Sequence, residues 1–261
     1  MKIHTTSKRM PIGFTATLFG VALAVCGFLG FVYVTNLTEF IHTLAATSLR
    51  QTGDQVLSWL DGKEQTLRAL EQAYLTLEDT PELFQEYMQR LRASDPELVD
   101  LYIGTAENPD EGGAFIVASD WVAPPGWDWT QRPWYVSAKD TDLPVLTDPY
   151  VDADTGQMVL SISKRVVKDG KVLGVVSVDI FMTTVNAIVN ASFITQTSVL
   201  NLIAKDGKYL SHEDNAKIQD GNFYIDFPAY EVSKADVAKG SYRMRMDLLE
   251  NNYFEIGRAH V

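Results

Sequence analysis

The pattern of apolar and polar positions first separates an N-terminal apolar run from the rest of the chain. From Pro11 to Leu37 the sequence is almost uncharged, and the first acidic residue downstream is Glu39. A helix needs about 20 apolar residues to span the hydrocarbon core of a bilayer, and this run is longer. A cleavable signal peptide usually has a shorter apolar region, whereas here the run continues through Val34. We therefore expect residues 11–37 to form an uncleaved transmembrane helix.

The charges on either side of this helix predict its orientation in the membrane. Lys2, Lys8 and Arg9 precede the apolar run, and the remainder of the chain is acidic. Because Lys and Arg accumulate on the cytoplasmic side of a membrane, residues 1–10 are expected to form a cytoplasmic tail. Everything after residue 37 is then expected to lie outside the cell membrane.

Helical spacing continues beyond the apolar run. Leu60, Leu67 and Tyr74 recur every seven residues, and a second such series contains Val56, Leu70 and Leu77, with Lys63 on the same stripe. This pattern predicts a long amphipathic stalk helix over residues 38–79, which packs against a domain or against a second copy of itself. Asp79-Thr80-Pro81 would end it and start a second helix, which stops near Asp95-Pro96.

From Leu98 the period changes to that of strands. Residues 98–103 and 114–118 are strand-like, and a Trp- and Pro-rich loop follows from Trp121 to Trp134. Residues 158–167 and 172–181 alternate around Lys168-Asp169-Gly170-Lys171, and an Asp-Gly pair between two such runs is a strong hairpin signal. The sequence predicts an α+β domain with one antiparallel sheet over residues 80–190.

A second, smaller sheet unit is expected over residues 191–254. Residues 198–204 resemble a strand, Lys205-Asp206-Gly207-Lys208 a turn, and residues 209–212 its return. One possible nucleotide sequence that encodes the last seven residues, 255–261, is the same as a common sequencing-adapter sequence. We therefore expect them to be an artefact and the natural protein to continue beyond Phe254.

Composition excludes several classes of protein. A net charge of −12 opposes nucleic-acid binding, because nothing would neutralise phosphates. The single cysteine, Cys26, lies in the apolar run and cannot form a disulfide within one chain. We expect no metal site and no cofactor, since the histidines are scattered and no glycine-rich phosphate loop is present. Ser161 and Ser163 alternate on a strand without a positioned base, so no catalytic residue is expected and the chain is not expected to be an enzyme.

Six residues suggest a binding site for a small zwitterion: Arg132, Trp134, Tyr135, Tyr150, Asp152 and Asp179. Singly, each has a plain explanation, such as a surface ion pair for Arg132, core packing for the aromatic residues and turn chemistry for Asp152. Asp179 ends a strongly apolar strand, where an ionised carboxylate needs a partner. Together, the guanidinium can bind a carboxylate through two parallel hydrogen bonds, while Tyr150 and the two aspartates surround an ammonium group.

This spaced set resembles the double Cache sensor family of bacterial receptors, and within it the amino-acid-binding branch. The resemblance covers residues 37–254 and implies two tandem PAS-like modules, a ligand-binding membrane-distal one (80–190) and an incomplete membrane-proximal one (191–254). It also implies that Arg132, Trp134 and Tyr135 face the ligand's carboxylate, while Tyr150, Asp152 and Asp179 hold its α-amino group. One position departs from the family pattern, which has Tyr where this chain has Trp127; an indole N–H can donate to a carboxylate but cannot accept.

The resemblance further implies a receptor in the bacterial inner membrane, homodimeric through its stalk helix, that senses an extracellular amino acid. Its output would be a methyl-accepting chemotaxis module, with a diguanylate cyclase or a histidine kinase as the alternative. An amine or polyamine is the alternative ligand, although Arg132 argues for a carboxylate. Two readings from other classes remain: a membrane-tethered hydrolase that uses Asp152 and Asp179 as an acid–base pair, and an adhesive ectodomain whose charged groups do not converge.

Overall fold

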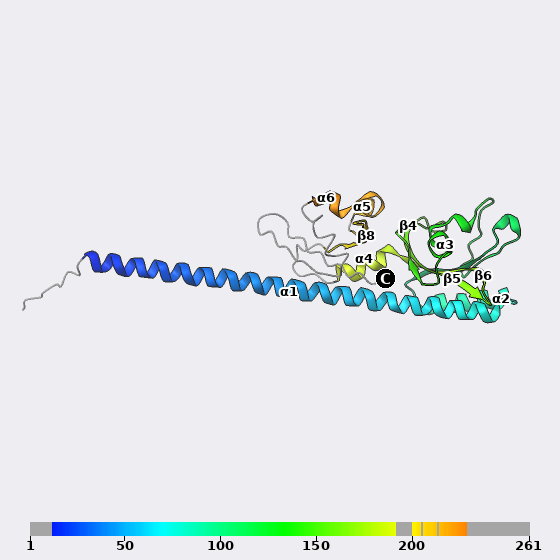
Figure 1. Cartoon of the computed structure of the whole chain (residues 1–261), viewed down its shortest axis with the longest axis horizontal. Coiled ribbons are helices and arrows are strands. Elements are labelled where there is room, and N and C mark those ends of the chain that lie inside the picture. Colours follow the sequence, from blue (N-terminus) through cyan, green and yellow to red (C-terminus); the bar gives the residue numbers. More distant parts are fainter. Residues whose placement is uncertain (1–11, 192–199, 205, 213, 229–261) are drawn as a thin grey trace, which may run out of the picture. The chain divides into compact units, whose positions relative to one another are not determined.

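A computed structural model describes residues 12–191, 200–204, 206–212 and 214–228 (Figure 1). The expected cytoplasmic tail, the start of the expected strand at Ser198 and the expected artefact at 255–261 lie outside these residues. Helix α1 runs without interruption from Ile12 to Leu77 and spans both predicted helical segments. The chain divides into two compact units, Met1–Thr47 and Ser48–Val261.

The first unit contains the apolar part of α1. An 18-residue window of this helix has a mean hydropathy of 2.2, and none of that window is buried. Its large apolar side chains are open to the surroundings; Phe19, for example, is 69% exposed and Phe28 67%. By length and composition this helix can cross a membrane, as predicted.

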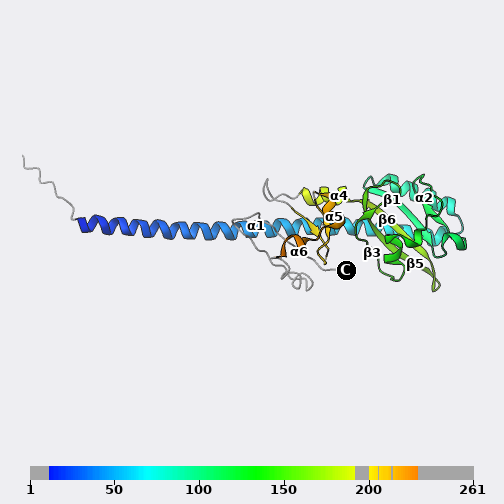
Figure 2. The same ribbon diagram turned by 90° about the horizontal axis from the view of Figure 1, so that it is seen from above.

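The second unit is built on one antiparallel sheet, which confirms the predicted α+β domain. Its strands are β1 (Leu98–Thr105), β2 (Phe115–Val117), β3 (Val145–Leu146), β4 (Tyr150–Val151), β5 (Met158–Lys168) and β6 (Lys171–Phe181). The order is β2-β1-β6-β5-β3, with β4 also paired to β5; Figure 2 labels β1, β3, β5 and β6 of this sheet. A short 3-10 helix, η1 (Pro109–Glu111), lies in the loop between β1 and β2.

The β5–β6 hairpin confirms the prediction made from Asp169 and Gly170. Both residues have positive φ angles, 51° and 78°. Two successive positive φ values give the turn whose twist matches that of the flanking strands, and Asp-Gly is one of the few pairs that adopts them cheaply.

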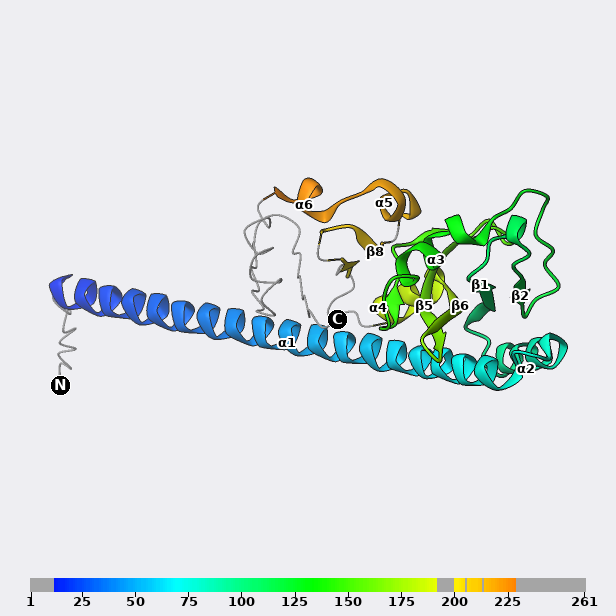
Figure 3. The ribbon, with the colours of Figure 1, turned by 45° about the vertical axis from the view of Figure 1, so that its right-hand side comes forward.

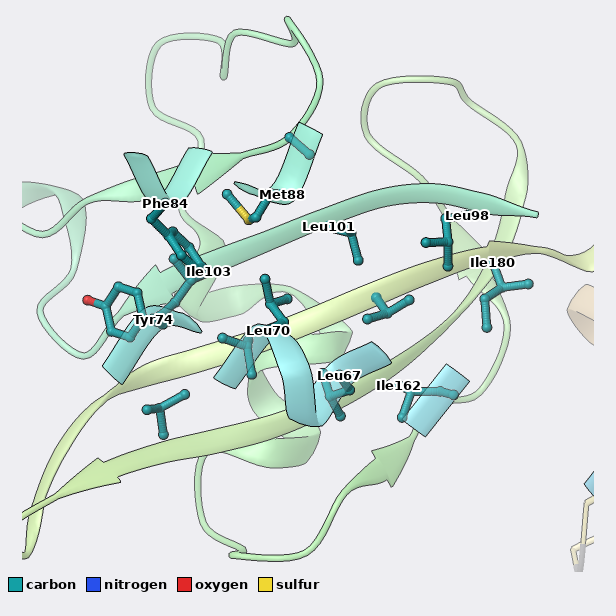
Figure 4. Packing of buried hydrophobic residues seen from close by; sticks show 14 residues of the cluster. Leu67, Leu70, Tyr74, Phe84, Met88, Leu98, Leu101, Ile103, Ile162 and Ile180 are labelled. Atoms are coloured by element: carbon teal, nitrogen blue, oxygen red, sulfur yellow. The ribbon is translucent and has the colours of Figure 1, made fainter. Parts of the chain in front are cut away.

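Helices pack on one face of the sheet (Figure 3). Leu67, Leu70 and Tyr74 of α1 join Phe84 and Met88 of α2 (Pro81–Ser94) against apolar side chains of β1, β5 and β6. Figure 4 shows this cluster, in which most side chains are entirely inaccessible to solvent. The helical spacing of apolar residues in the two predicted helices therefore correctly identifies residues of α1 and α2 that pack in the main core.

Lys63 interrupts the apolar stripe of α1 for a specific reason. Its side chain is 6% exposed, and its Nζ lies 2.5 Å from Asp95 Oδ2 and 2.6 Å from Glu97 Oε2. Trp59 also donates to Glu97, at 2.7 Å. Because a buried ammonium needs compensating charge, this cluster ties α1 to the loop that enters β1.

The other face of the sheet carries α3 (Pro133–Ala138), which is labelled in Figure 3, and the 3-10 helix η2 (Trp129–Gln131). Trp129, Trp134 and Tyr135 are nearly buried there, beside Tyr102 of β1. Gly104 allows this close packing, because a Cβ atom at that position would lie 2.3 Å from Cδ1 of Trp129.

Beyond the sheet, α4 (Met182–Asn190) leads to a two-stranded antiparallel pair, β7 (Leu202–Ile203) with β8 (Tyr209–Ser211). Helices α5 (Asn215–Asp220) and α6 (Phe223–Asp226) follow. The predicted return strand is present, whereas the described part of the preceding strand is shorter than expected. A tandem second module stays a prediction.

Candidate functional site

Along three neighbouring strands, alternate side chains form a row of polar groups on the face of the sheet opposite α1 and α2. Leu101, Val178 and Ile162 point into the helical core, so their sequence neighbours point the other way. Those neighbours include Asp100 of β1, Asp179 of β6 and Ser161 of β5. The strand register pairs Asp100 with Asp179 and Asp179 with Ser161. Two carboxylates and a hydroxyl therefore lie side by side in the middle of the sheet.

Asp179 is the more deeply buried of the two carboxylates, with 1% of its surface exposed against 8% for Asp100. Its Oδ1 accepts hydrogen bonds from Ser161 Oγ at 2.5 Å and Tyr102 Oη at 2.6 Å. Tyr150 Oη lies farther away, 3.3 Å from Oδ2. All three partners are hydroxyl groups, and in the described part of the chain no cationic side chain forms an ion pair with this carboxylate.

Burial without a cation changes how the groups around Asp179 ionise. The pKa of Asp179 is raised from 3.8 to about 7, and the largest cause is desolvation by burial. The hydrogen bonds from Ser161 and Tyr102 act to lower this pKa, whereas the nearby charges of Asp152 and Asp100 raise it further. Desolvation likewise raises the pKa of Asp100, although backbone hydrogen bonds to it act in the opposite direction. The pKa values of Tyr102 and Tyr150 are well above the ordinary value, first by burial and then by the charge of Asp179.

Arg132 occupies the position before α3, where Pro133 fixes the first helical residue. Its Nη2 donates to the backbone carbonyl of Val151 at 3.0 Å, and its guanidinium carbon lies 5.5 Å from the centre of the Tyr150 ring. Among the ion pairs of the described residues, none involves Arg132, so a surface ion pair does not explain it. Tyr150 thus has a guanidinium over its ring and a buried carboxylate beside its hydroxyl group.

A small pocket of about 30 Å³ joins these groups. Its lining comes from β1, β2, the loop before η2, the start of α3 and the residues around β4: Asp100, Tyr102, Phe115, Val117, Trp121, Trp127, Arg132, Trp134, Tyr150, Asp152, Ala153 and Asp154. A volume of this size holds about two water molecules. Five of the seven residues predicted from the sequence line it.

Two predicted residues lie elsewhere. Asp179 lies behind Tyr102 and Tyr150, to which it is hydrogen-bonded. Tyr135 packs against Trp134, and its hydroxyl group donates to the backbone carbonyl of Thr105 at 3.2 Å. Its predicted role at a ligand carboxylate requires this hydroxyl to change partner.

Trp127 and Asp152 have unused hydrogen-bonding capacity. The Nε1 of Trp127 is buried and has no hydrogen-bond partner, which is costly for an indole N–H. Asp152 Oδ2 accepts from the backbone N and the hydroxyl group of Thr155, both at 2.7 Å, which is the turn chemistry expected of it. Its Oδ1 is left for another donor.

Sequence reasoning missed several lining residues, notably Asp100, Tyr102, Phe115 and Trp121, and it missed the role of Ser161. A signal for them was present. Asp100 and Tyr102, like Ser161 and Ser163, interrupt apolar strands at a spacing of two, which places polar groups on one face. The described residues contain no group of three or more His, Cys, Asp or Glu that could hold a metal ion.

Comparison with known proteins gives the following relatives. Residues 66–187 match the family model of the first PDC sensor domain of methyl-accepting chemotaxis protein-like proteins. The methyl-accepting chemotaxis protein McpC of Bacillus subtilis is 31% identical over 134 residues, which are 51% of this chain and 20% of that protein. PctB of Pseudomonas aeruginosa is 26% identical over 183 residues, 70% of this chain and 27% of that protein. The chain therefore spans about a quarter of the length of these relatives, which are named as chemotaxis receptors and not as enzymes.

Solved structures show the same architecture. The ligand-binding domain of the Pseudomonas fluorescens chemoreceptor CtaA, in complex with L-valine, has a TM-score of 0.59 and 28% identity, covering 68% of this chain and 77% of that one. The ligand-binding domain of P. aeruginosa PctB, in complex with L-Arg, has a TM-score of 0.58 and 27% identity, covering 66% and 70%. The resemblance inferred from the residues of the site is confirmed.

Proposed function

We propose that this chain, whose residues 66–187 match the first PDC sensor domain of methyl-accepting chemotaxis protein-like proteins, is the sensing part of a transmembrane receptor for a free amino acid. The observation that carries the proposal is the distribution of charge at the pocket. Arg132 has no carboxylate partner among the described residues, and Asp179 has no cationic one. A ligand with a carboxylate at one end and an ammonium group at the other satisfies both.

The Tyr150 side chain relates the two ends. Its ring lies under the guanidinium of Arg132, and its hydroxyl group reaches Asp179. A zwitterion placed along this side chain would direct its carboxylate to Arg132 and its ammonium group towards Asp179, Asp152 and Tyr150. Charge-assisted hydrogen bonds contribute roughly 1.5–3 kcal/mol each. Several of them, less the costs of association, are consistent with micromolar affinity, about −8 kcal/mol.

Trp127 supplies a further donor for the carboxylate. Its buried Nε1 has no partner, and a ligand oxygen would remove the cost of leaving this group unpaired. This supports retaining Trp127 among the ligand-binding residues despite its departure from the family pattern.

The pocket must enlarge for any amino acid to enter, because about 30 Å³ is too small. Trp121 and Trp127 belong to the loop that closes it, and their rings contact each other edge to face at 4.9 Å. We propose that this loop opens for the ligand and closes on it. A difference in ligand affinity between the two arrangements is what a receptor can use as a signal.

The proposed topology follows from the sequence and from α1. Residues 1–10 form the cytoplasmic tail, 11–37 cross the bacterial inner membrane, and 38–79 form a stalk through which two copies associate. Residues 80–190 form the membrane-distal sensor module, and residues 191–254 contribute to a membrane-proximal one. The relatives' names support chemotaxis as the output; a diguanylate cyclase or a histidine kinase is the alternative.

An excess of acid at the pocket favours a second candidate ligand class. Asp100, Asp152 and Asp154 line the pocket with a single guanidinium, and Asp179 lies directly behind it. An amine without a carboxylate would gain from the acids but nothing from Arg132. The two classes are therefore distinguished by the dependence of binding on this arginine.

The proposal is tested by thermal unfolding of the full chain in detergent, with each of the twenty amino acids and with polyamines. A ligand that binds the folded state raises the midpoint by mass action. At least one amino acid should raise it, and Arg132→Gln should remove most of that effect. Arg165→Gln is the matched control, since Arg165 pairs with Asp142 and does not line the pocket. A midpoint raised by polyamines only would replace the amino acid with an amine, and no effect from any compound would contradict the proposed function.

A further inference from the structure

The two oxygens of Asp179 are in different situations. Each neighbouring hydroxyl group has one proton to donate. Tyr102 and Ser161 use theirs on Oδ1, at 2.6 and 2.5 Å. Tyr150 makes its short contact with Ser161 Oγ, at 2.7 Å, and is 3.3 Å from Asp179 Oδ2. Because Ser161 already donates to Oδ1, it accepts the Tyr150 proton, and Oδ2 is left without a strong donor.

A buried carboxylate oxygen without a donor or a cation is costly. A proton on Oδ2 relieves this cost by removing the negative charge, and an incoming positively charged donor relieves it by compensating that charge. We propose that a proton and the ligand's ammonium group compete for Oδ2 of Asp179, so that ligand binding releases a proton and weakens as the pH falls through neutrality. This inference rests on the proposed function, since it names what regulates the same site.

The charged and titratable groups around Asp179 reinforce the competition. Asp100 on β1 is its register partner, and Asp152 follows β4; both carboxylates oppose a second negative charge. Tyr102 and Tyr150 have pKa values raised well above the ordinary range and stay neutral donors. Arg132, before α3, lies over the Tyr150 ring and lowers the pKa of that tyrosine, but it forms no ion pair with Asp179 in the described part of the chain.

The pKa of Asp179, about 7 by burial, fixes the pH range. At pH 8 the carboxylate is mostly ionised in the free protein and can accept an ammonium group at once. At pH 6 it is mostly protonated and must first lose its proton. Since an adjacent positive charge lowers the pKa of a carboxyl group, the occupied site stays ionised across this range. Affinity should therefore fall about tenfold from pH 8 to pH 6.

The experiment is calorimetric titration of the full chain in detergent with each of the twenty amino acids, at pH 6 and at pH 8. Measurements at pH 6 in two buffers of different ionisation enthalpy count the protons released. The α-carboxylate and α-ammonium groups keep their charges between pH 6 and pH 8; histidine and cysteine, whose side chains titrate in or near this range, are left out of the comparison. We expect tighter binding at pH 8 by about tenfold and release of close to one proton at pH 6.

Two variants identify the titrating group. Asp179→Asn cannot take up the proton, so any residual binding should be independent of pH. Asp100→Asn removes the other buried carboxylate of the row; binding should keep its pH dependence, with the midpoint at lower pH because a like charge has gone.

Each remaining outcome is decisive. Equal affinity at both pH values without proton release overturns the competition and leaves the proposed function standing. Loss of the pH dependence in Asp100→Asn assigns the proton to Asp100 and overturns it as well. If no amino acid binds at either pH, the proposed function fails and the competition fails with it.

Discussion

Replacing Asp179 by Asn should stabilise the free protein at neutral and alkaline pH. A carboxyl group whose pKa is higher in the folded than in the unfolded state binds its proton more tightly when folded. Stability is then greatest below the unfolded pKa and declines as the pH rises to the folded pKa. Burial raises the pKa of Asp179 from 3.8 to about 7. At about 1.36 kcal/mol for each pH unit, ionisation of this group costs up to about 4 kcal/mol at pH 8.

Asn keeps the shape and cannot ionise, so it avoids this cost. Urea unfolding of the full chain in detergent, followed by Trp fluorescence, measures the free energy of unfolding at pH 5 and pH 8. Asp179→Asn should be more stable than the parent protein by about 1.5–2 kcal/mol at pH 5, where the unfolded carboxyl group is already mostly ionised, and by up to about 4 kcal/mol at pH 8. Asp110→Asn, at an exposed position in η1, is the control and should differ little at either pH. A loss of stability in Asp179→Asn at pH 8 would refute the reasoning, because it would mean that the ionised carboxylate is well compensated.

Four further substitutions test the fold. Gly104→Ala should destabilise the protein by about 1–3 kcal/mol, since its Cβ would lie 2.3 Å from the Trp129 ring. Gly62→Ala has open space around it in α1 and should stabilise the protein by up to about 1 kcal/mol. A urea midpoint that moves the other way in either variant would contradict the described surroundings of that glycine. Gly170→Ala should lower the free energy of unfolding by about 1 kcal/mol, because φ at this residue is 78°. An unchanged urea midpoint would contradict a left-handed conformation at this position. Lys63→Met leaves two carboxylates without their cation and should lower the free energy of unfolding by about 1–3 kcal/mol; a more stable variant would show that the buried ion pairs do not offset their desolvation.

The elements of the sheet domain were predictable because local signals and tertiary packing agree there. Residues 158–167 and 172–181 alternate around Asp169-Gly170, and the observed strands extend only one residue further at the turn. The stripe on α1 predicted its buried face. The one polar residue on it, Lys63, could not be explained from the sequence, because its partners come from the loop before β1.

The sequence predicted several residues that line the candidate pocket, but it did not predict how deeply each of them is buried. Arg132, Tyr150 and Asp152 were expected to converge on a pocket, and they line one. The sequence could not show that Asp179 is enclosed by hydroxyl groups, since this depends on the register that places Ser161 opposite it. Nor could it show that Tyr135 donates to β1, because side-chain direction at the start of a short helix depends on what packs against it.

A crystal structure of the full chain, grown from detergent with the amino acid that raises the unfolding midpoint most, would show directly where the ligand binds. We expect the ligand to lie along Tyr150, with its carboxylate hydrogen-bonded to the guanidinium of Arg132 and its ammonium group on Oδ2 of Asp179. A ligand bound with its two ends reversed, or outside the pocket between these residues, would contradict it.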